Sequence, residues 1–133
     1  MSAVQRGKDT FINGCMAGFD ILAAEQVVVM QGQFPQLKLV TIAPFSVRFF
    51  LQDKCWTELW KERAFEISDL SDRAISLSEH YRPGIYYERD RVLVDYSSEI
   101  ICYWDGGHGG TKHTVEYARS KGLTIYNLYQ KST

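Results

Sequence analysis

The sequence predicts an α/β fold in which a mostly parallel sheet carries helices on both faces. Apolar runs of strand length alternate with segments of helical periodicity along the chain. Such alternation requires crossover connections, and these produce parallel strands. The chain of 133 residues is long enough to bury the core of one domain. We therefore expect a single domain over residues 1–133.

The predicted strands are short apolar segments bounded by turn residues. They cover Thr10 to Asn13, Leu37 to Ala43, Arg73 to Ser78, Ile100 to Trp104 and Leu123 to Leu128. The segment L-K-L-V-T-I-A is the clearest, because apolar and β-branched residues fill it and Pro44 ends it. Ligands of parallel sheets bind at the edge where the strands' carboxyl ends meet.

The predicted helices fill the intervals between these strands. One begins at Phe19 and Asp20, and the others cover Trp56 to Ile67, Tyr86 to Asp95 and Thr111 to Lys121. Gly32 and Gly122 lie just past the first and last of them, where a glycine commonly ends a helix. In the helix that begins at Tyr86, we expect Val92, Leu93 and Tyr96 to face inward.

Two segments are expected to be irregular. Phe45 to Lys54 is rich in aromatic residues, and Phe45, Phe49 and Phe50 are expected to form a pocket wall or a subunit contact. Gln130 to Thr133 are expected to fray.

The composition is that of an ordinary globular protein and excludes several functional classes. Hydrophobic residues make up 45% of the chain, charged residues 23%, and the net charge is −1. Without a basic excess, we do not expect a nucleic-acid partner. Apolar runs such as Val27 to Met30 are too short to cross a membrane, and the N-terminal segment lacks the apolar core of a signal peptide. Cys15, Cys55 and Cys102 are too widely spaced for a metal knuckle, so we expect reduced thiols and a cytoplasmic location.

The most informative stretch is a glycine-rich turn between a strand and a helix. The residues I-I-C-Y-W-D-G-G-H-G-G-T-K-H-T-V-E-Y-A run from Ile100 to Ala118. The candidate ligand-binding residues in it are Asp105, Gly106, Gly107, Gly109, Gly110, Thr111 and Thr114. Glycines let a ligand approach the backbone closely, and the amides and dipole of a helix N-terminus favour an anion. Threonine hydroxyls complete such a cradle for phosphate, which indicates a nucleotide-type ligand.

The spacing excludes two common phosphate-binding loops. The turn does not contain G-x-x-x-x-G-K-[ST], because Lys112 follows Thr111 rather than preceding it. It does not contain G-x-G-x-x-G either, because Gly107-x-Gly109 continues as Gly110-Thr111-Lys112, with lysine where the third glycine would stand. A tight structural turn therefore stays open as the alternative interpretation.

A second glycine-bearing turn strengthens the ligand-binding interpretation. N-G-C-M-A-G-F-D leads into the first long helix and supplies Gly14, Gly18 and Asp20 as candidates. Asp20 either caps its helix or accepts a hydrogen bond from a ribose hydroxyl. Both turns follow predicted parallel strands and are expected at the same edge of the sheet.

Other polar and aromatic residues near the turn have competing interpretations. Trp104 either stacks on a base or packs in the core. His108 and His113 are expected at the surface, and with Asp105 they do not form a chelating motif. We therefore expect neither a metal nor a resident cofactor.

The set of segments resembles the SLOG superfamily, and within it the YpsA-like branch. The matching segments are F-I-N-G-C-M-A-G-F-D-I-L-A-A-E (Phe11 to Glu25), F-P-Q-L-K-L-V-T-I-A-P-F (Phe34 to Phe45) and Y-E-R-D-R-V-L-V-D-Y-S-S-E-I-I-C-Y-W-D-G-G-H-G-G-T-K-H-T (Tyr87 to Thr114). They occur in the order of that superfamily, which includes DNA-processing protein A and the LOG phosphoribohydrolases. The resemblance implies a Rossmann-like three-layer sandwich that senses or processes nucleotides. It also implies that Arg89 binds phosphate, whereas its charged neighbours alone are typical of a solvated helix face.

Two departures from the superfamily pattern are present. SLOG domains usually begin with a strand and a glycine-arginine turn, and residues 1–133 lack this segment; Met1 to Lys8 match at most the end of the following helix. This departure is compatible with three explanations: a shortened protein, a fragment, or a sheet that another chain completes. A sheet that lacks a strand exposes an edge, and an exposed edge favours a homo-oligomer. LOG enzymes carry G-G-x-G-T-x-x-E, but Thr114 stands at the glutamate position.

The missing carboxylate favours binding over catalysis, since N-glycosidic cleavage needs a carboxylate near the ribose. We expect a nucleotide-binding protein whose catalytic residues, if any, are unknown. The alternatives are a nucleoside 5′-monophosphate phosphoribohydrolase that uses Arg89 with Glu116 or Asp20, and an oligomeric interaction subunit with a vestigial pocket.

Overall fold

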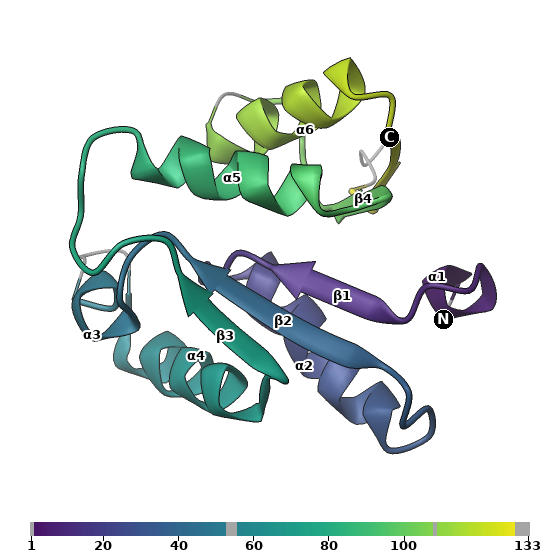
Figure 1. Cartoon of the computed structure of the whole chain (residues 1–133), viewed down its shortest axis with the longest axis horizontal. Helices are drawn as coiled ribbons and strands as arrows, with labels where there is room; N and C mark the ends of the chain where they lie inside the picture. Colours follow the sequence, from purple (N-terminus) through teal and green to yellow (C-terminus); the bar gives the residue numbers. More distant parts are fainter. Residues whose placement is uncertain (1, 53–55, 108, 130–133) are drawn as a thin grey trace. The chain divides into compact units, whose positions relative to one another are not determined.

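The predicted α/β fold is confirmed in the computed structural model of the chain, which is Rossmann-like in its succession of parallel strands and helices (Figure 1). The structure describes residues 2–52, 56–107 and 109–129. The described strands pair in parallel, in a three-stranded sheet and a two-stranded sheet. The larger sheet belongs to the compact unit Met1–Tyr81, and the smaller sheet belongs to the compact unit Arg82–Thr133.

The first unit contains a sheet with the strand order β1-β2-β3. Its elements are α1 (Ser2–Gln5), β1 (Thr10–Asn13), α2 (Phe19–Gln31), β2 (Lys38–Ala43), α3 (Val47–Phe50), α4 (Glu58–Leu70) and β3 (Arg73–Ser76). Thr10 of β1 lies opposite Lys38 of β2, and Val40 of β2 lies opposite Arg73 of β3. The helices α2 and α4 contact each other and cover the same face of this sheet (Figure 1).

The core of the first unit follows from helical spacing. In α2, Ile21, Ala24 and Val27 recur every third residue and are buried. In α4, Ala64 and Ile67 form the matching buried face. The helix α4 begins at Thr57, whose hydroxyl accepts a hydrogen bond from the amide of Trp60 at 3.3 Å.

An ion pair joins the two helices outside this apolar contact. Nε of Arg63 on α4 donates to Oε2 of Glu25 on α2 at 2.8 Å, and the other guanidinium arm contacts Oε1. The hydrogen bond from Arg63 holds the pKa of Glu25 below its usual value. Because both side chains are part-exposed, solvent screens this pair and its contribution to stability is modest.

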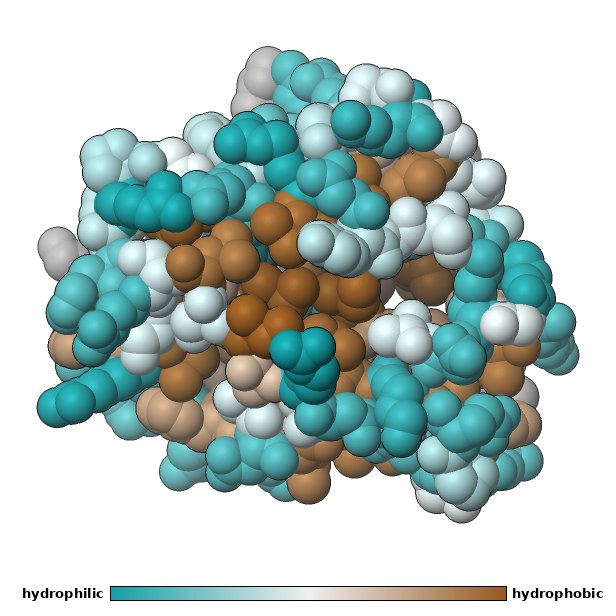
Figure 2. All heavy atoms as spheres, in the orientation of Figure 1, coloured by the Kyte–Doolittle hydropathy of each residue, from teal (hydrophilic) through white to brown (hydrophobic). Residues whose placement is uncertain are grey.

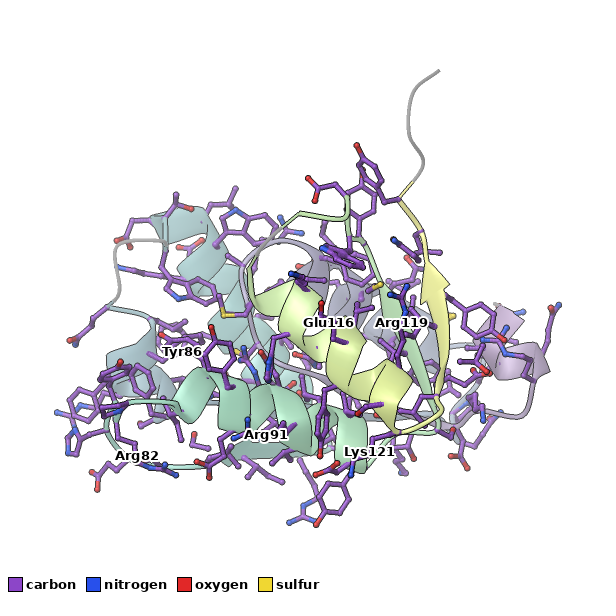
Figure 3. All side chains as sticks on the ribbon, turned by 90° about the horizontal axis from the view of Figure 1, so that it is seen from above. Arg82, Tyr86, Arg91, Glu116, Arg119 and Lys121 are labelled. Carbon is purple, nitrogen blue, oxygen red and sulfur yellow. The ribbon has the colours of Figure 1, made fainter. Side chains whose placement is uncertain are left out.

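The second unit contains α5 (Ile85–Asp95), β4 (Glu99–Cys102), α6 (Gly110–Ser120) and β5 (Thr124–Asn127). Glu99 of β4 lies opposite Thr124 of β5. The helix α6 packs on both strands and also on α5. Figure 3 shows α5 and α6 side by side, with Arg91 on α5 and Glu116 on α6.

Four expectations from the sequence need correction or lie outside the described residues. Val47–Phe50 of the segment expected to be irregular form the short helix α3. Phe45 and Phe50 are not a subunit contact, because they are buried and their rings pack edge to face at 5.4 Å. Tyr96 does not face inward: it follows the last residue of α5 and is 78% exposed. The expected fraying of residues 130–133 lies outside the described residues.

The surface is mixed in polarity. Figure 2 shows many hydrophilic side chains, with hydrophobic ones among them. Within the described part of the chain, no helix combines the length and the apolar character that a membrane crossing requires.

Candidate functional site

An open hollow of about 310 Å³ lies at the glycine-rich turn of the second unit, between the end of β4 and the start of α6. The described residues that line it are Tyr103, Trp104, Asp105, Gly109, Gly110, Thr111 and Tyr129. The structure therefore brings Asp105, Gly109, Gly110 and Thr111 together, as expected from their positions after one strand. His108 lies outside the described residues.

The turn is held in shape by its own hydrogen bonds. Oδ1 of Asp105 accepts a hydrogen bond from the amide of Gly107 at 2.8 Å, and Nε1 of Trp104 donates to the carbonyl of Gly107 at 2.9 Å. Gly106 and Gly109 have φ values of +92° and +137°, which other residues rarely adopt. These hydrogen bonds hold the turn in its bent conformation without a ligand. The amide of Gly107 donates to Asp105 and is therefore not available to a ligand.

The start of α6 forms the polar side of the hollow. The first-turn amides, including those of Gly110 and Thr111, have no carbonyl acceptor within the helix. Together with the helix dipole, they favour an anionic group of a ligand. The carboxylate of Asp105 lies in the same lining and favours a group that donates hydrogen bonds. This combination suits a ligand that carries both an anionic group and hydroxyls.

Aromatic rings form the other side of the hollow. The rings of Tyr103 and Tyr129 lie 5.3 Å apart and nearly perpendicular to each other. Asn127, at the end of β5, fixes the backbone between them. Its Nδ2 donates to the carbonyl of Trp104 at 2.8 Å, and its Oδ1 accepts from the amides of Trp104 and Tyr129 at 3.0 and 3.1 Å.

Arg89 is buried rather than solvated, together with its neighbour Asp90. Nε of Arg89 donates to Oδ1 of Asp90 at 2.9 Å. The other oxygen of Asp90, Oδ2, faces Gly110 at the start of α6, where a Cβ added to Gly110 would lie 3.9 Å from it. The structure therefore places the Arg89–Asp90 pair directly behind the glycine-rich turn. Binding of phosphate by Arg89 stays a prediction.

The turn after β1 has a different construction. Asn13 is buried: its Oδ1 accepts from the amide of Cys15 at 2.9 Å, and its Nδ2 donates to the hydroxyl of Thr41 at 3.0 Å. Oδ2 of Asp20 accepts from the amide of Met16 at 3.3 Å, so this carboxylate closes its own turn. Gly14 and Gly18 belong to this turn, and Gly18 begins α2 with a φ of +94°. These candidates lie in the first unit, whereas the hollow lies in the second.

Several candidates in the second unit do not line the hollow. The hydroxyl of Thr114 donates to the carbonyl of Gly110 at 3.1 Å, within its own helix. Glu116 is exposed, its Oε1 lies 3.7 Å from Nζ of Lys112, and it is not among the residues that line the hollow. The ring of His113 lies 4.4 Å from that of Tyr87, and its buried Nε2 has no hydrogen-bond partner among the described residues.

The thiols and acidic side chains of the described residues do not form a metal-binding cluster. Burial raises the pKa of the Cys102 thiol, and the nearby charge of Arg119 offsets part of this effect. Figure 3 shows Arg119 on α6. Cys15 is fully buried. In the described ranges, no group of three His, Cys, Asp or Glu side chains is arranged to hold a metal ion.

Sequence reasoning missed Tyr103, Tyr129 and Asn127. Tyr103 belongs to an apolar run that was expected to be a buried strand, and it is 57% exposed. The strand order could have indicated these residues. Because β4 and β5 are parallel neighbours, the residues that follow them lie at the same edge of the sheet.

Comparison with known proteins agrees with this architecture. The YpsA family model, described as the YspA SLOG family, matches residues 1–130. The SPbeta prophage-derived protein YoqJ of Bacillus subtilis strain 168 is 24% identical over 131 residues, which cover 90% of this chain and 74% of that protein. A UPF0398 protein of Bacillus cereus strain B4264 is 26% identical over 133 residues, which cover 97% of this chain and 70% of the relative. Because the family model matches nearly the whole chain, this protein belongs to the YspA SLOG family.

Proposed function

We propose that the chain binds a nucleotide or nucleotide-derived molecule in the hollow at the glycine-rich turn. One observation carries this proposal: helix-start amides, a threonine hydroxyl and aromatic rings line a single open space. Amides and hydroxyl suit a phosphate, and aromatic rings suit a base. Its volume of about 310 Å³ is near the lower limit for small-molecule sites, which favours a ligand the size of one nucleotide.

The polar side of the hollow is assigned to the phosphate. The hydroxyl of Thr111 and the first-turn amides of α6 supply donors, and Gly109 and Gly110 leave the backbone accessible. The carboxylate of Asp105 is assigned to a ribose hydroxyl, because a carboxylate accepts such a hydrogen bond and repels phosphate.

A thermal-shift screen followed by calorimetry tests the proposal. The ligands are nucleoside mono-, di- and cyclic phosphates and ADP-ribose, with the parent nucleosides as controls. Thr111→Val removes one hydroxyl and should weaken the phosphorylated ligand by about 0.5–1.5 kcal/mol or more. Thr124→Val is the matched control, because Thr124 is exposed on β5 and does not line the hollow. Absence of stabilisation by every nucleotide would overturn the proposal.

We infer binding without turnover. The carboxylate expected after Thr111 is absent from the sequence, and Glu116 is exposed beside Lys112. Incubation of the protein with nucleoside monophosphates, followed by chromatography of free bases, should give no more base than a sample without protein. Base release that exceeds this blank and is saturable would support the phosphoribohydrolase alternative instead.

We further propose a homo-oligomer in the cytoplasm. Among the described strands, β1 pairs with β2 alone, and an edge strand of this kind favours pairing with another chain. The free thiol of Cys102 is compatible with the reducing conditions of the cytoplasm.

A further inference from the structure

Tyr103 and Tyr129 lie just beyond the ends of two neighbouring strands. Tyr103 follows β4 directly, and Tyr129 lies two residues after β5. Because these parallel strands end together, both side chains reach the same hollow. Their rings form an edge-to-face pair at 5.3 Å, so one ring supports the orientation of the other.

The backbone beneath these rings is fixed in advance. Beyond the last strand pair, the amide of Leu128 donates to the carbonyl of Cys102 at 2.8 Å. The side chain of Asn127 then continues the pairing, with hydrogen bonds to both backbone groups of Trp104 and to the amide of Tyr129. A ligand therefore meets two tyrosines that need little ordering upon binding.

On the aromatic side of the hollow, a ligand meets the faces of aromatic rings and no hydrogen-bond donor from the indole of Trp104. The indole N–H of Trp104 donates to the carbonyl of Gly107 and is not available to a ligand. Tyr103 is 57% exposed, and Tyr129 is partly exposed. Accessible tyrosine rings opposite a polar helix start suit a ligand that is planar at one end and charged at the other.

We propose that Tyr103 and Tyr129 form an aromatic platform in which the base of the bound nucleotide stacks on the face of one ring and the perpendicular ring supports this arrangement from the side. This inference rests on the proposed function and assigns the aromatic side of the same hollow. Every nucleobase has a stacking face, so the platform selects for the presence of a base more than for its identity. The assignment predicts that ring area, and not the tyrosine hydroxyl, determines affinity.

The test compares loss of the ring with loss of the hydroxyl. AMP, GMP, CMP and UMP are titrated calorimetrically into the wild-type chain, and the tightest of them is titrated into each variant. Tyr103→Leu and Tyr129→Leu should each weaken binding roughly 5- to 100-fold, the range expected for loss of base stacking. Tyr103→Phe should retain affinity within about twofold. Tyr96→Leu is the matched control, because Tyr96 is 78% exposed at the end of α5 and does not line the hollow.

The outcomes separate this inference from the proposed function. Wild-type binding with unchanged affinity in both leucine variants would overturn the platform and leave nucleotide binding intact. A loss in Tyr103→Phe equal to that in Tyr103→Leu would also overturn it, because a hydroxyl contact would then explain the effect. If the wild-type chain binds neither these four nucleotides nor any other nucleotide of the thermal-shift screen, the proposed function and the platform both fail. Circular dichroism of each variant establishes that the fold is retained.

Discussion

Asn127 pairs with Trp104 through its side chain in the way that one strand pairs with another. Its Nδ2 donates to the carbonyl of Trp104 at 2.8 Å, and its Oδ1 accepts from the amide of Trp104 at 3.0 Å. The two strands are thereby held together beyond Cys102, where β4 ends. The residues that line the hollow begin at this point, so one amide side chain links sheet pairing to the shape of the candidate site.

Replacement of Asn127 should therefore affect both stability and ligand binding. Asn127→Ala removes the hydrogen bonds to Trp104 and Tyr129, but water replaces them at this exposed position. We expect the free energy of unfolding to fall by about 1–2 kcal/mol, as measured by urea denaturation. Asn127→Asp keeps the acceptor for both amides and loses only the donor, so a smaller effect is expected. A variant Asn127→Ala with wild-type stability would contradict this assignment.

Gly109 and Gly110 should respond differently to substitution by alanine. Gly109 has a φ of +137°, so Gly109→Ala should destabilise the chain by about 1–3 kcal/mol through backbone strain. Gly110 is in the first turn of α6, and an added Cβ would make an ordinary 3.9 Å contact with Asp90. Gly110→Ala should keep the fold and interfere only with a ligand that approaches the backbone. Gly32→Ala, at the end of α2, is the control for helix propensity.

Denaturation and calorimetry of these three variants check the prediction. Equal stability of Gly109→Ala and Gly110→Ala would show that the positive φ is not required. Wild-type nucleotide affinity in a folded Gly110→Ala variant would argue against close approach at that residue.

The arrangement of strands and helices was predictable because each depends on local periodicity. Lys38–Ala43 form β2 where apolar and β-branched residues cluster, and Phe19–Gln31 form α2 up to Gly32. The glycine-rich turn was also predictable from local sequence. Backbone positions with positive φ favour glycine, so such a turn is visible in the sequence as a cluster of glycines. The occurrence of two sheets was not predictable, because strand pairing joins residues far apart in the chain.

The chemistry of the site was harder to predict than its location. The run Glu88 to Arg91 resembles a solvated charged face, yet Arg89 and Asp90 are buried as a pair. Burial depends on what packs against α5, and local sequence does not encode it. Asn127 likewise lies 23 residues after Trp104, whose backbone it holds, so local sequence does not reveal the contact.

The buried pair of Arg89 and Asp90 should be sensitive to loss of one partner and tolerant of loss of both. Arg89→Met leaves the carboxylate of Asp90 buried without its hydrogen bond from Nε and should cost about 3–5 kcal/mol of unfolding free energy. The double variant Arg89→Met with Asp90→Leu should recover much of this loss, because no unpaired charge is left inside. Denaturant titrations of the single and double variants measure the difference. A double variant that is less stable than the single variant would show that the charges are needed for another reason.

The ion pair between α2 and α4 predicts a specific pH dependence. The hydrogen bond from Arg63 holds the pKa of Glu25 below its usual value of 4.5. The folded state therefore binds this proton less readily than the unfolded state, and the contribution is present above the unfolded pKa. It is lost as the pH falls through the folded pKa, so the stabilisation should decline below about pH 4.5. Glu25→Gln should be less stable than wild type at pH 7, and the difference should shrink toward about pH 3. A difference that stays constant over this range would mean that the charge of Glu25 is not involved.

Association of subunits is the last prediction, and it rests on the free edge of β1. Thr10–Asn13 pair with β2 on one side, and no described strand pairs with the other side. Unpaired backbone groups on an edge strand favour pairing with another chain, and a symmetric dimer is the most common result. We expect light scattering at micromolar concentrations to give a mass above the 15.3 kDa of one chain. Thr10→Lys places a charge at an exposed position of this edge and should shift the equilibrium toward the monomer. Ser120→Lys, at the exposed end of α6, adds the same charge away from the edge and should leave the mass unchanged. A wild-type mass of one chain throughout a dilution series would exclude the oligomer, and equal masses for both lysine variants would place the contact elsewhere.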